Sequence, residues 1–366
     1  MNKKSLLISI SAFVFALFIA LLILLLLGKN PIEFLIALFT VFFNDKNGTL
    51  IRSFFTRIVP LTFSALGVAF AFRTGLFNIG AEGQVSMGIF GAVLVGTIPG
   101  IPVGLHFLLV ILTGFIFGAV WGFIPGVLRA YFEVHEVVIT IMMNYIALYL
   151  LRGLLLPMFS DPLQNHQTLP LQPSATLTQL FGETEILNVP LNYWVFLGFA
   201  LIGVAVFYFI INKTVFGFEL RAGGLNEAGA KYAGMHSKRN IMLSMTIAGG
   251  FAGIGGAFFM LTSVTTATAS FSQTGYGFDG LAAALLGSST ALGAFAGSGI
   301  LAYLSAISTK IQQLVGVPKE ITEMIIALIL FFIAMSYAFE LFWNKFSKDK
   351  PKKNRTTSKL KEEEQV

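Results

Sequence analysis

The chain has 366 residues, of which 55% are hydrophobic and 11% are charged, and its formal net charge is +6. Because soluble domains carry roughly 25% charged residues, this composition predicts a membrane protein, and the excess positive charge does not indicate nucleic acid as a partner. There is no cysteine, which excludes disulfides, thiolate metal sites and thiol nucleophiles, and the four scattered histidines lack metal-ligand spacing. We therefore expect no metal site and no cofactor bound by this chain.

The N-terminal segment is expected to be a retained membrane span. Lys3 and Lys4 precede an apolar run from Leu6 to Leu27, and no small-residue cleavage site follows it. This run is longer than the ~7–15-residue core of a signal peptide and has the ~20 residues needed to cross the hydrocarbon. The next apolar region, Ile32–Phe43, is too short to cross, so we expect it at the membrane interface or entering only partway.

The apolar runs along the rest of the chain predict an all-α polytopic membrane protein with about ten transmembrane helices, in a permease domain of residues 1–342. In chain order the expected spans are Leu6–Leu27, Phe54–Phe72, Phe77–Ile98, Val103–Leu128, Glu136–Pro157, Tyr193–Ile211, Ile241–Thr262, about two between Phe278 and Ser308, and Ile321–Phe342.

The charges between the spans predict the orientation in the membrane, since loops rich in Lys and Arg stay on the cytoplasmic side. Residues 158–190 contain no Lys or Arg, whereas residues 213–239 contain five. We therefore expect the first loop outside and the second in the cytoplasm, and an even number of spans puts both termini inside. Lys310 and Lys319 fall outside in this topology, which counts against it.

The segments outside the membrane are expected to be irregular. Four prolines interrupt the external loop, at Pro162, Pro170, Pro173 and Pro190, and proline favours turns over regular structure. Residues 343–366 form a basic tail that ends in an acidic run, and we expect it to be disordered and solvated in the cytoplasm.

The segment Gly75–Gly91 carries Asn78, Glu82 and Gln84 among five glycines inside an apolar region. A charge at membrane depth costs several kcal/mol or more, so something must offset the burial of Glu82. On a helix Asn78 and Glu82 share a face, and the glycines allow close helix packing or a local break. Two interpretations stay open: a discontinuous helix that lines a polar path, or a buried motif in which Glu82 hydrogen-bonds a neighbouring helix.

A second glycine-rich cluster, Gly275–Gly280, contains Asp279 and resembles Gly75–Gly80 about 200 residues earlier. In the expected topology the first cluster lies on the cytoplasmic side and the second on the outer side. Glycine-interrupted helices in corresponding, inverted positions are typical of transporters built from an inverted repeat. We therefore predict such a repeat, with discontinuous helices and with Asp279 as a further candidate on the solute pathway.

Polar residues recur every four positions in the fifth expected span, at Glu136, Thr140 and Asn144, and therefore fall within one sector of the helix. Such a stripe can line a cavity for a hydroxylated solute, or it can supply hydrogen bonds between helices. Thr140, Asn144 and the adjacent Tyr145 are candidates for the pathway. For Glu136, near the cytoplasmic end, a structural role at the interface is favoured.

The basic loop 213–239 has the composition of a docking element. Residues Leu225–Tyr232 are expected to form a short helix with Gly234 at its C-terminal cap, and an Ala- and Gly-rich helix on the cytoplasmic face suits insertion into a partner's groove. The alternative is a solvated connector that merely obeys the positive-inside rule. The candidates for coupling are Glu219, Arg221, Asn226, Glu227, Lys231 and Tyr232.

Motifs for catalysis are missing from the sequence. It has no Gly-x-x-x-x-Gly-Lys-Ser/Thr phosphate loop and no Gly-x-Ser-x-Gly nucleophile elbow. Glu82 and Glu136 do not form an obvious general acid and base pair. We therefore expect no catalytic residue and no enzymatic activity of the chain's own.

Three stretches resemble one known family. They are Phe77–Gln84 (Phe-Asn-Ile-Gly-Ala-Glu-Gly-Gln), Glu136–Ile146 and Arg221–Ala228. They are similar to the inner-membrane permeases of ABC importers for ribose and branched-chain amino acids, and the first is most similar to the nucleoside branch. The similarity runs from about Leu50 to Phe342. The loop departs from the best-known Glu-Ala-Ala coupling motif, because Glu227-Ala-Gly-Ala stands there instead.

This resemblance implies a multi-pass subunit of a bacterial plasma membrane that imports nucleosides by alternating access. It also implies three protein partners besides the lipid bilayer and the nucleoside: an ABC ATPase that uses the ATP and docks around Gly224–Gly234, a second homologous permease subunit, and an external solute-binding lipoprotein that meets the outer loops. The neutral polar groups of Asn78, Gln84 and Asn144 suit an uncharged, hydroxylated solute.

Three alternatives remain open. The same machinery can import a pentose sugar or a branched-chain amino acid. A secondary transporter would instead couple uptake to H⁺ or Na⁺ through Glu82. A membrane scaffold without transport is disfavoured by the charged residues at membrane depth.

Overall fold

The computed structural model describes residues 3–42, 44–45, 47–155, 157–182, 184–263, 266–267 and 272–334, and the chain divides into two units. One unit comprises residues 1–28 and 325–366, and the other comprises residues 29–324. In the first unit, helix α1 (Lys3–Leu26) carries Phe15, whose ring meets that of Phe332 on helix α14 (Lys319–Ala334) edge-on, with the centroids 5.1 Å apart. The predicted basic tail lies outside the described residues.

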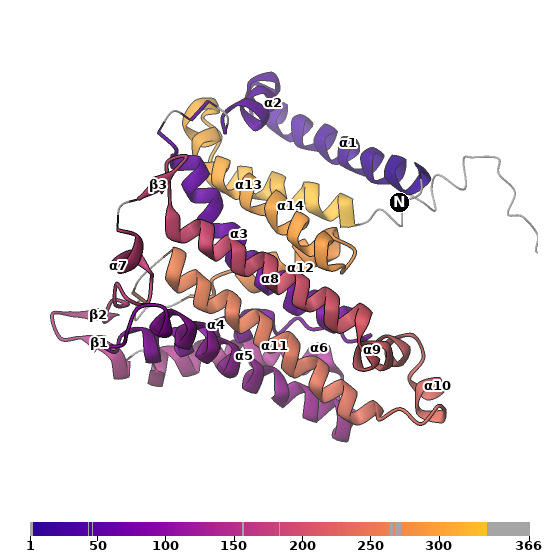
Figure 1. The fold of residues 1–366 in the computed structure, drawn as a ribbon. Helices are drawn as coiled ribbons and strands as arrows, with labels where there is room; N and C mark the ends of the chain where they lie inside the picture. Colours follow the sequence, from indigo (N-terminus) through magenta and orange to yellow (C-terminus); the bar gives the residue numbers. More distant parts are fainter. Residues whose placement is uncertain are drawn as a thin grey trace, which may run out of the picture. The chain divides into compact units, whose positions relative to one another are not determined.

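The second unit is a bundle of helices, with a long connection that carries strands β1 to β4 between α6 and α8 (Figure 1). Its helices are α2 (Pro31–Thr40), α3 (Thr49–Arg73), α4 (Ala81–Gly96), α5 (Leu105–Phe132), α6 (Glu136–Leu150), α8 (Leu191–Lys213), α9 (Val215–Leu225), α10 (Glu227–Tyr232), α11 (Ser237–Thr262), α12 (Tyr276–Leu286) and α13 (Ala291–Val315).

Six helices of the described residues are long and apolar enough to cross a membrane: Thr49–Arg73, Leu105–Phe132, Glu136–Phe159, Leu191–Lys213, Ser237–Thr262 and Ala291–Val315. The protein is therefore mostly helical and polytopic, as predicted. Shorter apolar helices lie at Val14–Leu26, Pro31–Thr40, Ala81–Gly96 and Tyr276–Leu286. The total of about ten spans and the inward position of both termini stay predictions.

Three expected spans differ in detail from the helices observed. The span expected from Phe77 begins only at Ala81, because residues 76–79 have no regular structure. The region after Phe278 does hold two helices, but α12 has only 11 residues and is too short to cross alone. The span from Glu136 changes into a π-helix at Leu151–Leu155. The two short helices α4 and α12 thus begin at the glycine-rich clusters, while the inverted repeat with discontinuous helices stays a prediction.

The loop of residues 158–190 is more regular than its prolines predicted. Strands β1 (Ser160–Asp161) and β2 (Gln164–Thr168) pair antiparallel, as do β3 (Glu185–Ile186) and β4 (Val189–Pro190), and α7 (Thr178–Phe181) lies between the pairs. Backbone hydrogen bonds tie the loop to the bundle: Thr168 N–H donates to the Ala267 carbonyl and Gln172 N–H to the Gly96 carbonyl, both at 2.8 Å. Because proline has no backbone N–H, the loop's backbone hydrogen bonds are donated by neighbouring residues such as these two.

The core of this unit is built on close contact between helices. On α5, Gly114 and Gly118 face Gly249 and Gly253 of α11, and a Cβ atom on Gly253 would fall on the Gly114 carbonyl oxygen. Small residues at such positions let two backbones approach, which is the main attraction between helices in a lipid environment. The arrangement leaves the β-strands at one end of α8 and α11 and helices α9 and α10 at the other (Figure 1).

Candidate functional site

The chain between α3 and α4 turns back at Gly75 and runs without helical structure to Gly80. Gly75 has φ +76°, a conformation that favours glycine. Asn78 is fully buried, and its Oδ1 accepts a hydrogen bond from Gly80 N–H at 3.0 Å. Its Nδ2 donates to Gln84 Oε1 at 3.0 Å. The two predicted pathway residues Asn78 and Gln84 therefore hydrogen-bond each other. They fix the conformation of the non-helical residues 75–80, which we call the break.

Helix α6 packs against this break and forms hydrogen bonds with it and with the first turn of α4. Asn144 is 2% exposed; its Nδ2 donates to the Ile79 carbonyl at 2.9 Å, and its Oδ1 accepts from Gly83 N–H at 2.7 Å. Thr140 is fully buried, and a Cβ atom on Gly80 would lie 3.0 Å from its own Cβ. Since Gly83 lies in the first turn of α4, Asn144 satisfies one of the amide groups that a helix start leaves without a partner.

We predict that Asn144→Leu destabilises the protein before it alters its selectivity. The substitution removes both hydrogen bonds. It leaves the buried Gly83 N–H without a partner, at a cost of about 1–3 kcal/mol, and also the part-buried Ile79 carbonyl. The expected result is a lower melting temperature in detergent and a reduced yield of folded protein. Tyr149→Leu is a matched control on the exposed face of the same helix. Normal thermal stability of Asn144→Leu with altered uptake kinetics would contradict this prediction and favour a role on the pathway.

Glu82 joins the two glycine-rich clusters. Its side chain is fully buried; Oε1 accepts from Thr274 Oγ1 at 2.9 Å and Gly275 N–H at 3.0 Å, and Oε2 accepts from Gly277 N–H at 2.7 Å. These donors form the N-terminus of α12, where a negative charge is stabilised by the helix dipole. Glu82 also lies in the first turn of α4. One carboxylate therefore lies at the N-termini of two short helices. The three hydrogen bonds that it accepts offset the cost of burying its charge.

Asp279 and Tyr145 have different surroundings from these buried residues. Asp279 is exposed in the first turn of α12, and Tyr145 is 54% exposed on α6 next to the buried Asn144. The structure therefore brings Asn78, Glu82, Gln84, Thr140 and Asn144 together, and it leaves these two on the surface of the unit. Nearby, Glu136 forms an ion pair with Arg129 at 3.3 Å, joining α6 to α5.

Helices α9 and α10 form the basic loop, and only some of the expected coupling residues face outward. Asn226 caps α10, since its Oδ1 accepts from Gly229 N–H at 2.9 Å, so the helix begins at Glu227 rather than at Leu225 as predicted. Tyr232 is 94% exposed. The predicted C-terminal glycine, Gly234, has φ +81°.

Other predicted coupling residues bind within the chain. Glu219 accepts a hydrogen bond from Asn240 Nδ2 at 2.9 Å and lies 4.0 Å from the Arg239 guanidinium, while Arg221 Nε donates to the Gly217 carbonyl at 3.4 Å. Glu227 and Lys231 instead line a cleft of about 740 Å³ between α10 and the adjoining ends of α5 and α11.

A backbone contact that the sequence did not predict joins this loop to the break. A Cβ atom on Gly75 would lie 2.6 Å from Gly224 Cα, and one on Gly224 would lie 2.7 Å from Gly75 N. The C-terminal part of α9 therefore rests directly on the turn that leads into α4. In the sequence the two glycines belong to separate glycine-containing motifs about 150 positions apart, and only the fold brings them into contact.

Comparison with known proteins identifies the family. The family described as "Branched-chain amino acid transport system / permease component" matches residues 50–334. The chain belongs to this family. The match extends from α3 to α14. It therefore contains the break at residues 75–80, the buried Thr140 and Asn144 of α6, and helices α9 and α10. The protein is accordingly a permease component, a transport subunit distinct from an ATPase.

Several curated permeases are similar over most of their length. The guanosine ABC transporter permease protein NupP of Bacillus subtilis (strain 168) is 44% identical over 80% of this chain and 83% of its own. The nucleoside ABC transporter permease protein NupB of Lactococcus lactis subsp. cremoris is 32% identical over 93% and 94%. The glucose ABC transporter permease protein TsgB13 of Haloferax volcanii is 31% identical over 78% and 76%. No solved structure matches the chain.

Proposed function

We propose that this permease is the membrane-spanning subunit of an ATP-driven importer of nucleosides that works by alternating access. The cargo is inferred from the similarity to two permeases whose names specify guanosine and nucleosides, at 44% and 32% identity over most of the chain. The glucose permease of the same family is 31% identical, so a sugar is the second candidate. A branched-chain amino acid is supported only by the family description.

The proposal includes three protein partners. A separate ATPase binds ATP and docks on α10, where Tyr232 and the cleft lined by Glu227 and Lys231 offer an exposed surface. A second homologous permease completes the pathway. A solute-binding lipoprotein meets the ordered loop at the opposite end of the bundle. In this arrangement α9 and α10, and both chain termini, lie in the cytoplasm of a bacterial cell, as the loop charges indicate.

The contacts within the permease supply a route from the ATPase to the solute pathway. Movement of α10 shifts α9, and Gly224 of α9 bears on Gly75 at the start of the break. The break is held by Asn144, and its far end carries Glu82, which binds the N-terminus of α12. Because each contact is backbone to backbone or a buried hydrogen bond, a displacement at one end changes the position of α12 at the other.

Uptake by the purified complex in proteoliposomes tests this function. The complex of both permeases, the ATPase and the lipoprotein should import radiolabelled guanosine only with ATP, with vanadate blocking uptake and an ionophore leaving it unchanged. Loss of uptake with the ionophore while ATP persists would instead support ion coupling through Glu82. Competition by glucose, a pentose or leucine, without competition by nucleosides, would assign a different cargo.

We predict that Glu227→Arg uncouples the permease from its ATPase. Reversing a charge in a docking contact costs about 2 kcal/mol or more, which corresponds to a fall of more than about tenfold in affinity. The expected result is loss of the ATPase during co-purification and loss of uptake, with normal folding. Glu320→Arg is the matched control, since Glu320 is also an exposed glutamate in the first turn of a helix. Normal co-purification and uptake of Glu227→Arg would refute the docking role.

A further inference from the structure

Pro60 interrupts the backbone hydrogen bonding of α3, a helix long and apolar enough to cross a membrane. Because proline has no backbone N–H, the carbonyl of Thr56, four residues earlier, lacks its usual helical donor. At membrane depth a freed carbonyl needs another partner, which a Ser or Thr side chain can supply. The C-terminal end of α11 supplies it here: Oγ1 of Thr262 donates to the Thr56 carbonyl at 2.9 Å, and Oγ of Ser263 at 3.4 Å. A second helix therefore completes the hydrogen bonding of α3.

The hydroxyl of Thr262 has one hydrogen and two acceptors. Besides the Thr56 carbonyl, the carbonyl of Phe258, one turn earlier in α11, lies 2.7 Å from its Oγ1. A hydroxyl donates one hydrogen bond, and a bond to the carbonyl four residues back is common for threonine within a helix. If α3 moves away, Thr262 keeps the bond to Phe258. The link between the helices can therefore break and re-form without leaving this hydroxyl unsatisfied.

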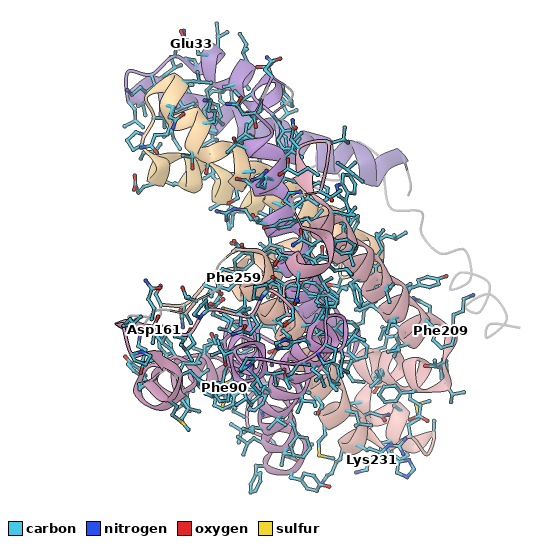
Figure 2. The ribbon with its side chains drawn as sticks, turned by 60° about the vertical axis from the view of Figure 1, so that its left-hand side comes forward. Glu33, Phe90, Asp161, Phe209, Lys231 and Phe259 are labelled. Atoms are coloured by element: carbon cyan, nitrogen blue, oxygen red, sulfur yellow. The ribbon has the colours of Figure 1, made fainter. Side chains whose placement is uncertain are left out.

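The link lies beside a cleft at one end of the bundle. The cleft has a volume of about 740 Å³, and its walls are formed by the loop of residues 158–190 together with Tyr193 and Thr262. The Tyr193 hydroxyl, on α8, donates to the Thr262 carbonyl at 2.9 Å. In Figure 2, Phe259 in the last turn of α11 lies nearer to Asp161 of this loop than to Lys231 of α10. The link is therefore at the end of α3 opposite the break, next to a cleft that water can enter.

The two parts of α3 on either side of Pro60 are attached to different parts of the molecule. Before the proline, Arg52 forms an ion pair with Glu185 of strand β3 at 2.6 Å. After it, Ser64 packs on α12, where a Cβ atom on Gly280 would fall on the Ser64 hydroxyl, and α3 then leads into the break. The first part is thus tied to the loop that the lipoprotein is proposed to meet. The second part is tied to the elements through which the ATPase is proposed to act.

We propose that Pro60 and Thr262 form a joint in α3, with Thr262 as the positioning residue that holds its two parts together. The proposal rests on the transport function proposed above. In one state Thr262 donates to the Thr56 carbonyl. In the other it donates only to Phe258, the Thr56 carbonyl binds water from the cleft, and the first part of α3 moves with the loop. Proline is required at residue 60, because any other residue would donate its own N–H to Thr56 and fix the helix permanently.

Pro60→Ala distinguishes a joint from a proline that is only tolerated. Alanine supplies the missing N–H to the Thr56 carbonyl, so we expect the melting temperature in detergent to equal or exceed that of the unaltered protein. Guanosine uptake per ATP by the complete complex should nevertheless fall by about threefold or more, the equivalent of one hydrogen bond between membrane helices. Uptake at the unaltered level would overturn the joint, since α3 would then work without a weak point at residue 60.

Thr262→Val removes the hydroxyl with little change of shape. Uptake per ATP should fall by about threefold or more, and Thr262→Ser, which keeps the hydroxyl, should restore it. Thr246→Val is the matched control, because Thr246 Oγ1 donates to the Met242 carbonyl of its own helix at 2.7 Å. In the Pro60→Ala background Thr262→Val should cause no further loss, since Thr56 is then bonded within α3. Additive losses in the double variant would overturn the joint.

The outcomes separate this inference from the proposed function. If the unaltered complex imports no nucleoside, the proposed cargo fails, and the same comparison is made with the solute that it does import. If it imports guanosine but Thr262→Val and Thr246→Val behave alike, the joint is overturned and nucleoside import stands. A lower melting temperature of Thr262→Val that Pro60→Ala reverses together with full uptake also overturns it, because the pair would then serve stability alone. If Thr262→Val does not assemble, uptake by Pro60→Ala decides.

Discussion

Glu82→Ala is expected to abolish uptake and to prevent formation of a stable complex. The substitution leaves Thr274 Oγ1 and the N–H groups of Gly275 and Gly277 without the acceptor that they share. Each hydrogen bond to a charged group contributes about 1.5–3 kcal/mol, and a buried donor without a partner costs about 1–3 kcal/mol. The total of several kcal/mol is a large part of the ~5–15 kcal/mol that stabilises a folded protein.

Glu82→Gln separates the charge from the shape of the side chain. The amide keeps one acceptor oxygen but turns an NH₂ group toward backbone donors, so we expect a smaller loss of stability and a strong reduction in uptake. The measurement is the melting temperature of the purified permease together with guanosine uptake. Glu33→Gln is the control, because Glu33 is an exposed glutamate whose Oε1 accepts a hydrogen bond from the neighbouring Asn30 Nδ2 at 3.0 Å. Full stability of Glu82→Gln combined with uptake that responds to an ionophore would contradict the structural role and favour ion coupling.

The need for a partner at Glu82 was predictable from the sequence, whereas the identity of that partner was not. A single carboxylate in an apolar glycine-rich segment implies an offsetting interaction, because an unpaired charge is too costly there. The donors come from residues 192 to 195 positions later in the chain. Backbone N–H groups carry no signature in the sequence, so only the fold reveals that α12 begins at this carboxylate.

The same distinction applies to Asn144. Spacing by four residues correctly placed Thr140 and Asn144 on one sector of α6, because helical periodicity is a local property. It left open whether that sector faces a path or another helix. The answer depends on where the non-helical residues 76–80 pass. It also depends on two hydrogen bonds that span more than 60 positions: Asn144 Nδ2 donates to the Ile79 carbonyl, and Gly83 N–H donates to Asn144 Oδ1. Long apolar helices are predicted well because length and composition define them, while breaks within them depend on tertiary partners.

The loop of residues 213–239 was likewise predicted from the sequence only in part. The sequence predicted a short helix before Tyr232, and α10 is present with Asn226 as its cap. It did not predict that α9 touches Gly75, since glycine has no side chain from which a contact can be inferred. This contact matters most for the proposed mechanism, because α9 adjoins the proposed docking surface on α10 and contacts the break at Gly75.

Gly224→Ala is expected to uncouple ATP hydrolysis from transport. An added Cβ would lie 2.7 Å from Gly75 N and 2.7 Å from the carbonyl carbon of Thr74, both of them backbone atoms that cannot rotate away. Helix α9 must therefore move off the turn, and the link to α4 loosens. We expect the complex to assemble and to hydrolyse ATP, with the number of guanosine molecules imported per ATP reduced by about tenfold or more, because overpacking costs about 1–3 kcal/mol and each 1.4 kcal/mol is a factor of ten.

Gly223→Ala is a closely matched control for this experiment. Gly223 precedes Gly224 in the same helix, and a Cβ atom there meets nothing within 4 Å. Both substitutions gain the same helix propensity, about 1 kcal/mol relative to glycine, so a difference between them isolates the contact with Gly75. If Gly224→Ala and Gly223→Ala import the same amount of guanosine per ATP, the contact does not transmit the movement. A deficit confined to Gly224→Ala would instead place the coupling step at the turn where α9 meets Gly75, since the proposed docking surface on α10 is the same in both variants.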